Sequence, residues 1–192
     1  ERSSNIISLR SLSVERTNAL LLPYFFPIHK MLPGLEDEAV GTADPSNPSF
    51  IIMPHFLNLT SEKLASSRDG IFVLYNGFNA VLWIGSQVNP VLLQSLFGID
   101  SFATLRSEKM SLLVEGNESS PTYSFNRKVH TVLNSLRSTF EDVISCSVLV
   151  IKEDSEPQLR LAVLNQLIED RTDNYWSYPQ FLLQLRDKLT PQ

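Results

Sequence analysis

Few side chains in this sequence have the type and spacing that catalysis or metal binding requires. The three histidines, His29, His55 and His130, lie far apart and share no metal-ligand spacing. His130 follows Val129 within a helical pattern, so we interpret it as a solvated or core-edge residue. Neither a phosphate-binding glycine motif nor a nucleophile-elbow serine motif occurs. The sequence therefore predicts no catalytic, cofactor-binding or metal-binding residue, and no enzyme activity.

Two further features could bind a cation or react as a nucleophile. The acidic run Glu36-Asp37-Glu38 lies in a stretch rich in Pro and Gly and lacks the alternating ligands of an EF-hand, so we interpret it as solvated. The single cysteine, Cys146, excludes a disulfide or a cysteine zinc ribbon within the chain. Its apolar neighbours indicate an inert thiol in a buried strand, because reactive cysteines need an electropositive, accessible setting.

The length and composition of the chain indicate one domain, or one domain with an appendage. Of the 192 residues, 43% are apolar and 19% are charged, which is enough to bury a sizeable core. The formal charge of -5 gives no basic footprint for nucleic acid. No apolar run is long enough to predict a membrane-spanning helix, and no signal-peptide pattern is present. Because the chain begins with Glu1 and not with methionine, we expect a piece of a longer protein.

A hairpin at the centre of the chain gives the strongest structural signal. Two apolar runs, Ile71 to Tyr75 and Ala80 to Ile84, flank an Asn76-Gly77 pair, whose residues tolerate positive φ in a tight turn. The runs barely alternate between apolar and polar residues, so both faces of the strands must be covered. We therefore expect a sheet with helices on either side, and Trp83 in its core.

The remaining elements follow from start and stop signals. Ser13 and Pro23 delimit a helix within 11–22 that carries Leu12, Ala19, Leu20 and Leu22 on or near one face. Asn89-Pro90 and Gly98 delimit a short helix over 91–97. The pattern also predicts an edge strand at 24–29, a loop at 31–48, a helical turn at 64–67, a helix at 124–140, a strand at 143–151 and two helices at 157–169 and 177–189.

Apolar residues at helical spacing predict which helix faces are buried. For the long helix they are Phe125, Val129, Val132, Leu133, Leu136 and Phe140. For the helix at 157–169 they are Leu161, Leu164, Leu167 and Ile168. The apolar residues of the last helix are Phe181, Leu182, Leu185 and Leu189.

The order of the elements predicts three segments. Strands and helices mix within 24–152, whereas only helices occur in 1–23 and 153–192. We expect a mixed α/β sheet domain in the middle, and the first and last helices to pack together as a split helical appendage.

Several motifs resemble a known family. Val81-Leu82-Trp83-Ile84-Gly85 is similar to the gelsolin-homology module, a five-stranded sheet between helices, which occurs in actin-severing and vesicle-coat proteins. The flanks discriminate between these two classes. Tyr24 to Met31, Leu96-Phe97-Gly98, Asn134 to Arg137 and Ser177 to Leu182 resemble the C-terminal part of the cargo-adaptor subunit of the COPII vesicle coat, the Sec-twenty-four family. The proline in the first of these motifs follows the aromatic pair, which departs from the family pattern.

This resemblance implies a function and a set of partners. The family carries its gelsolin-like module inside an all-helical domain, and the full-length protein acts in transport from the endoplasmic reticulum to the Golgi. It implies a cytoplasmic location on COPII-coated vesicles and the endoplasmic reticulum membrane. It also implies pairing with the sister subunit (the Sec-twenty-three family), capture of membrane cargo export signals, and indirect contact with the Sar GTPase and the outer coat. A structural zinc would lie upstream of this segment, and none is expected within it.

An actin-binding, calcium-responsive gelsolin module is the alternative hypothesis. It requires carboxylates around the sheet and the long helix. Asp69 and Glu141 are available, but no acidic residue lies between Ser124 and Phe140, which counts against a calcium ligand on that helix.

Overall fold

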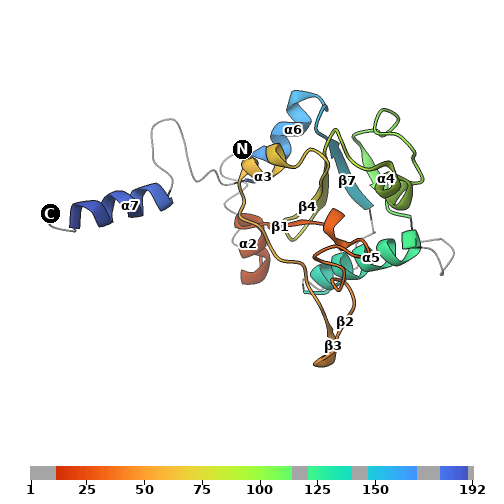
Figure 1. The fold of residues 1–192 in the computed structure, drawn as a ribbon, viewed down its shortest axis with the longest axis horizontal. Coiled ribbons are helices and arrows are strands. Elements are labelled where there is room, and N and C mark those ends of the chain that lie inside the picture. Colours follow the sequence, from red (N-terminus) through yellow and green to blue (C-terminus); the bar gives the residue numbers. More distant parts are fainter. Residues whose placement is uncertain (1–11, 114–120, 140–146, 168–177, 190–192) are drawn as a thin grey trace.

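A mixed five-stranded sheet forms the centre of the molecule (Figure 1). The computed structural model describes residues 12–113, 121–139, 147–167 and 178–189. The sheet has the order β1-β4-β5-β7-β6. Its strands are β1 (Tyr24–Pro27), β4 (Ile71–Tyr75), β5 (Ala80–Ile84), β7 (Ser147–Lys152) and β6 (Lys109–Ser111). Neighbouring strands are antiparallel except for β5 and β7, which are parallel. The predicted fold class is therefore confirmed.

The central hairpin has the bounds that the sequence predicts. All ten residues of β4 and β5 are buried, and the register pairs Ile71 with Ile84 and Tyr75 with Ala80. Four residues, 76–79, connect the strands. Gly77 has a φ of 84°. Asn76 contributes through its side chain, whose Oδ1 accepts hydrogen bonds from the backbone N–H groups of Phe78 and Asn79.

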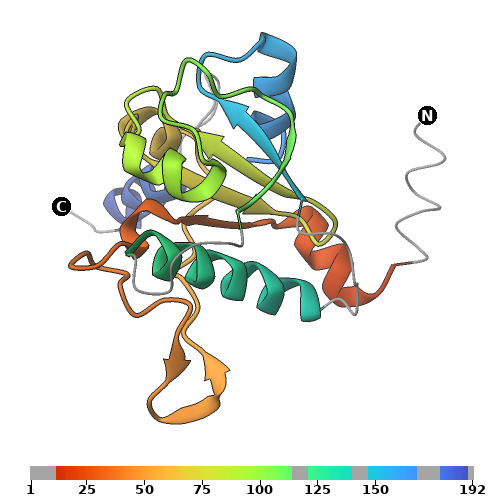
Figure 2. The same ribbon diagram turned by 90° about the vertical axis from the view of Figure 1, so that its right-hand side faces the viewer.

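Helices cover both faces of the sheet, as Figures 1 and 2 show. On one face lie α2 (Val14–Leu21), α4 (Pro90–Phe97) and α5 (Pro121–Ser138), and on the other lie α3 (Ser61–Ser66) and α6 (Pro157–Leu164). The first face contains the larger core, which includes Phe26, Ile28, Val73, Leu82, Ile84, Leu93, Leu96, Phe125, Val129 and Leu133. The second contains Phe25, Leu64, Phe72, Leu74, Val81, Trp83, Ile151, Val163 and Leu167. Successive residues of β4 and β5 thus pack alternately into the two cores.

Helix ends follow the predicted local signals. Ser13 caps α2 by accepting a hydrogen bond from the Arg16 N–H, and Asn89 caps α4 in the same way from Val91. Gly98 ends α4 in the left-handed conformation, with a φ of 69°. The predicted apolar face of the first helix is wrong in part. Ala19 is buried against the β4–β5 loop, but Leu20 and Leu22 are exposed.

The predicted loop over 31–48 is also wrong in part. It begins with the end of a 3-10 helix, η1 (His29–Met31), and it includes β2 (Ala43–Asp44) and the start of β3 (Asn47–Ile51), which pair as a small antiparallel hairpin. This hairpin projects away from the sheet (Figure 2). Its strands are mostly exposed and rich in polar residues and proline, so they lack the apolar alternation that signals a strand. The edge strand β6 is missed for the same reason, since it has three residues and little burial.

The long helix α5 buries the face that its spacing predicts, from Phe125 to Leu136. The next helix, α6, matches its prediction only in part. Leu161 and Leu164 are exposed, contrary to the prediction, whereas Leu167, just after the helix, is buried as predicted. Val163 is also buried, because the row formed by Leu159, Val163 and Leu167 faces the sheet. Phe140, Cys146 and Ile168 lie outside the described residues.

The last helix, α7 (Tyr178–Leu189), lies apart from the sheet and its covering helices (Figure 1). Its apolar residues Phe181, Leu182 and Leu185 are exposed. The division of the chain at 23 and 152 stays a prediction.

Candidate functional site

The histidines lie in separate parts of the structure and have local roles. The His29 Nδ1 accepts a hydrogen bond of 3.1 Å from the Ile71 N–H, so the imidazole extends the pairing of β1 with β4. The His130 Nε2 donates to the Leu113 carbonyl oxygen at 3.1 Å, and His55 is exposed. Among the described residues, no three His, Cys, Asp or Glu side chains lie close enough to hold a metal ion.

Two carboxylates of the acidic run, those of Glu36 and Glu38, bind groups of their own loop. Glu36 forms an ion pair of 2.7 Å with Lys30, and this hydrogen bond holds the pKa of the Glu36 carboxyl below its usual value. Glu38 accepts a hydrogen bond of 2.8 Å from the Gly34 N–H. The run therefore fixes the chain that leads from η1 toward the β2–β3 hairpin.

A denser charged cluster lies where the parallel strands β5 and β7 end. The Glu153 carboxylate accepts a hydrogen bond of 2.8 Å from the Ser86 N–H and lies 3.1 Å from the Arg68 Nε. Burial raises the pKa of Glu153. The Ser86 hydrogen bonds and the charges of Arg68 and Arg160 lower the pKa by a larger combined amount, so the net shift is downward. This cluster ties together three connections of the sheet, and we interpret it as structural.

Trp83 is a core residue, as predicted. Its side chain is 7% exposed and belongs to the cluster that α3 and α6 cover. It pairs across the hairpin with Phe72, which is also buried. These contacts explain why an apolar strand contains so large a side chain.

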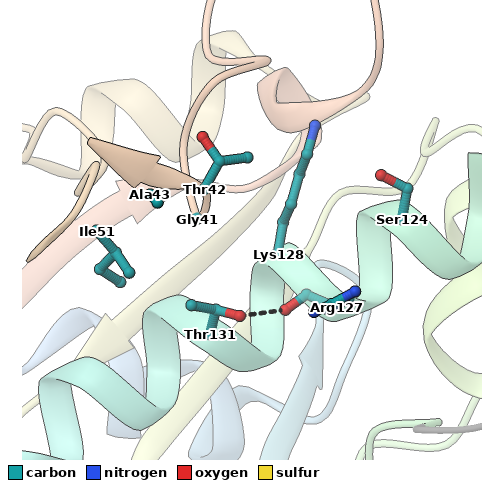
Figure 3. A pocket seen from close by; sticks show the side chains of 8 residues that line it. All are labelled: Gly41, Thr42, Ala43, Ile51, Ser124, Arg127, Lys128 and Thr131. Atoms are coloured by element: carbon teal, nitrogen blue, oxygen red, sulfur yellow. Dashed lines mark hydrogen bonds between the residues drawn. The ribbon is translucent and has the colours of Figure 1, made fainter. Parts of the chain in front are cut away.

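A groove lies between the base of the β2–β3 hairpin and α5 (Figure 3). Its volume is about 430 Å³. One wall consists of hairpin residues, and the other is a row of α5 residues at helical spacing. The lining residues are Gly41, Thr42, Ala43, Ile51, Ser124, Arg127, Lys128 and Thr131.

A glycine makes the close approach of hairpin and helix possible. A Cβ atom on Gly41 would lie 2.7 Å from the Lys128 carbonyl oxygen, and the Gly41 φ is 78°, which side-chain-bearing residues rarely adopt. The Gly41 N–H donates to the Ile52 carbonyl at 2.9 Å, which fixes the base of the hairpin. The Lys128 Nζ donates to the Glu38 carbonyl oxygen at 2.7 Å. Sequence reasoning missed this groove. The signal that could have indicated it is the polar row at 124, 127, 128 and 131 on one face of the long helix.

Exposed apolar side chains gather at the two ends of the described chain. Leu21 and Leu22 of the α2 region are 60% and 61% exposed. On α7, Phe181 and Leu183 are 49% and 50% exposed, and neighbouring leucines are similarly open. Helices with exposed apolar stripes of this kind are typical of surfaces that another element covers. No helix of the described residues is long and apolar enough to cross a membrane.

Comparisons with known proteins give consistent results. A sequence model of the gelsolin repeat matches residues 50–119. The protein transport protein SEC24 of Yarrowia lipolytica is 33% identical over 170 residues, which cover 88% of this chain and 17% of that protein. The sec24 protein of Schizosaccharomyces pombe is 32% identical over 194 residues, which cover 98% of this chain and 20% of that protein.

A solved structure is also similar. The crystal structure of the human COPII-coat protein Sec24c matches 92% of this chain and 20% of its own chain, with a TM-score of 0.60 and 24% identity. At this identity the likeness shows a shared fold. The chain spans about a fifth of the length of the curated relatives it matches.

Proposed function

This chain belongs to the SEC24 family as a segment of about a fifth of its relatives' length, and on that premise we propose that it is a structural and interaction part of a COPII coat cargo adaptor. The observation that carries the proposal is the likeness to SEC24 transport proteins over 88% to 98% of the chain. The full-length protein would act in transport from the endoplasmic reticulum to the Golgi, at the cytosolic face of the membrane and on coated vesicles.

The role we propose for this segment is non-catalytic. The buried sheet and its covering helices would hold the module, and the exposed apolar faces of α2 and α7 would dock it to the rest of the longer chain. The charged and polar side chains described above mainly bind backbone groups or one another, which supports a structural role. We further propose that a structural zinc of the full-length protein lies outside this segment.

The partners we propose are those of an inner-coat subunit. The full-length protein would pair with the sister subunit, bind export signals of membrane cargo, and contact the Sar GTPase and the outer coat indirectly. Co-purification of the full-length protein with the sister subunit tests the first of these contacts. We expect an equimolar complex in size-exclusion chromatography. Separate elution of the two folded proteins would contradict the proposal.

The alternative of an actin-binding, calcium-responsive module is not carried further. The gelsolin-repeat match covers residues 50–119, whereas the SEC24 likeness extends over nearly the whole chain and includes both flanks of that match.

A further inference from the structure

The groove between the β2–β3 hairpin and α5 has positive charge without a carboxylate in its walls. We propose that it is a docking site for an acidic, extended segment of a partner protein, in which a carboxylate or phosphoserine side chain contacts Arg127. The inference rests on the chemistry of the groove and goes beyond the proposed coat function, so either can fail without the other.

The side chains that line the groove carry positive charge only. None of its eight lining residues carries a carboxylate, whereas Arg127 and Lys128 are both cationic. The Lys128 ammonium binds the Glu38 carbonyl oxygen, a neutral partner that leaves its charge in place. The Glu38 and Asp44 carboxylates accept hydrogen bonds from the nearby Gly34 and Ser46 N–H groups, so both are held by their own loops. In a chain with a net charge of -5, the lining of the groove itself thus carries two cations and no carboxylate.

Arg127 is the group best placed to recognise an anion. It is exposed, and its guanidinium presents a planar set of donors that matches a carboxylate or a phosphate. The hydroxyls of Thr42 and Thr131 already donate to the Ala39 and Arg127 carbonyls. Their hydroxyl protons are therefore already used, and neither threonine is a free donor for a bound anion. Ser124, one turn before Arg127 in the first part of α5, adds a hydroxyl near the positive end of the helix.

The opposite wall indicates a peptide and not a free ion. Ala43 and Ile51 come from the hairpin strands and face the polar row of α5 across the groove (Figure 3). An extended chain places successive side chains on opposite sides. It could therefore direct an acidic side chain to Arg127 and a small apolar one to Ile51. The volume of about 430 Å³ lies in the range of ligand-binding pockets.

Amide chemical-shift mapping of the isotope-labelled 192-residue chain tests this inference. The probe is a decapeptide that alternates glutamate with valine and serine. Two further arms replace the glutamates with phosphoserine or with glutamine. We expect shifts confined to 41–52 and 121–131 with the glutamate or the phosphoserine peptide, weaker binding at higher salt, and no shifts with the glutamine peptide. Equal binding of the glutamine peptide, shifts elsewhere, or no binding of either acidic peptide would overturn the proposal.

Matched variants separate recognition from folding. Arg127→Ala should weaken binding by at least about tenfold, since hydrogen bonds to charged groups contribute roughly 1.5–3 kcal/mol. Arg106→Ala removes another exposed arginine outside the groove and should leave binding unchanged. Ser124→Glu suits the first turns of a helix and places a competing carboxylate beside Arg127, so it should block binding without lowering stability. Retained affinity in both Arg127→Ala and Ser124→Glu would contradict the assignment.

Discussion

Trp83 is the largest side chain in the smaller of the two cores. It is 7% exposed and packs among residues of β4, β7, α3 and α6. Trp83→Ala should therefore lower the free energy of unfolding by about 3–5 kcal/mol, because it removes buried area and leaves a cavity. Urea denaturation followed by circular dichroism measures this loss.

The matched control for Trp83 is Phe50, an aromatic residue that is 64% exposed on β3. Phe50→Ala should change the free energy of unfolding by no more than about 0.5 kcal/mol. Equal losses in the two variants would show that the core on the α6 side is not central to stability.

Glu153 makes the stability of the fold depend on pH. Its pKa in the folded state is lowered, so its contribution is present above its ordinary value of about 4.3 and is lost as the pH falls through the lower folded-state pKa. Glu153→Gln should therefore be less stable than the parent chain at about pH 7, and the difference should shrink toward about pH 3. Thermal unfolding of both proteins across this range provides the measurement. A difference that is constant with pH would rule out the ion pair as its cause.

At the residue scale, the sequence predicts burial well where apolar spacing is regular. Phe125, Val129 and Leu133 are buried as their spacing requires. Buried polar residues carry no comparable signal. Asn126 is 5% exposed, and its Nδ2 donates to the carbonyl oxygens of Ser95 and Leu113. These hydrogen bonds form only when α4 and α5 are in contact, so the sequence of α5 alone does not indicate that Asn126 is buried.

Among the elements, α4 shows how local chemistry fixes a helix. Asn89 accepts the Val91 N–H, Pro90 occupies the first turn, and Gly98 ends the helix. Asn89→Ala should cost about 1 kcal/mol, within a range of roughly 0.5–2, because an N-terminal amide of the helix loses its partner. Denaturant unfolding beside Gln94→Ala, an exposed position on the same helix, provides the comparison. An unchanged free energy of unfolding in Asn89→Ala would contradict the capping role.

The elements that the sequence does not predict were missed for one physical reason. The β2–β3 hairpin and β6 are short and bury few apolar side chains, so their pairing depends on partners that are distant in the chain. The hairpin is held by contact of Gly41 with the backbone of α5, nearly ninety positions later. The groove is built on that contact, so the polar row of α5 indicates one wall of the groove but not the hairpin that forms the other wall.

At the scale of the whole molecule, α7 has an apolar face that the described residues leave open. Leu182 and Leu185 are each 43% exposed, and the helix lies apart from the sheet (Figure 1). Replacing both leucines with serine should leave the stability of the 192-residue chain nearly unchanged. In the full-length protein the same change should cost roughly 2–5 kcal/mol per leucine, because the rest of the chain would bury them. Differential scanning calorimetry of parent and variant, in the segment and in the full-length protein, measures the loss of stability. Equal losses in the segment and the full-length protein would contradict docking of α7.

The proposed function makes this segment part of an inner-coat adaptor of about five times its length. The most direct measurement is sedimentation of the full-length protein, with and without the sister subunit, on liposomes that carry the activated Sar GTPase. We expect the full-length protein to reach the membrane only in the presence of the sister subunit and in equal amount to it. Membrane recruitment that is independent of that subunit, or no recruitment while both proteins are folded, would contradict the proposed function.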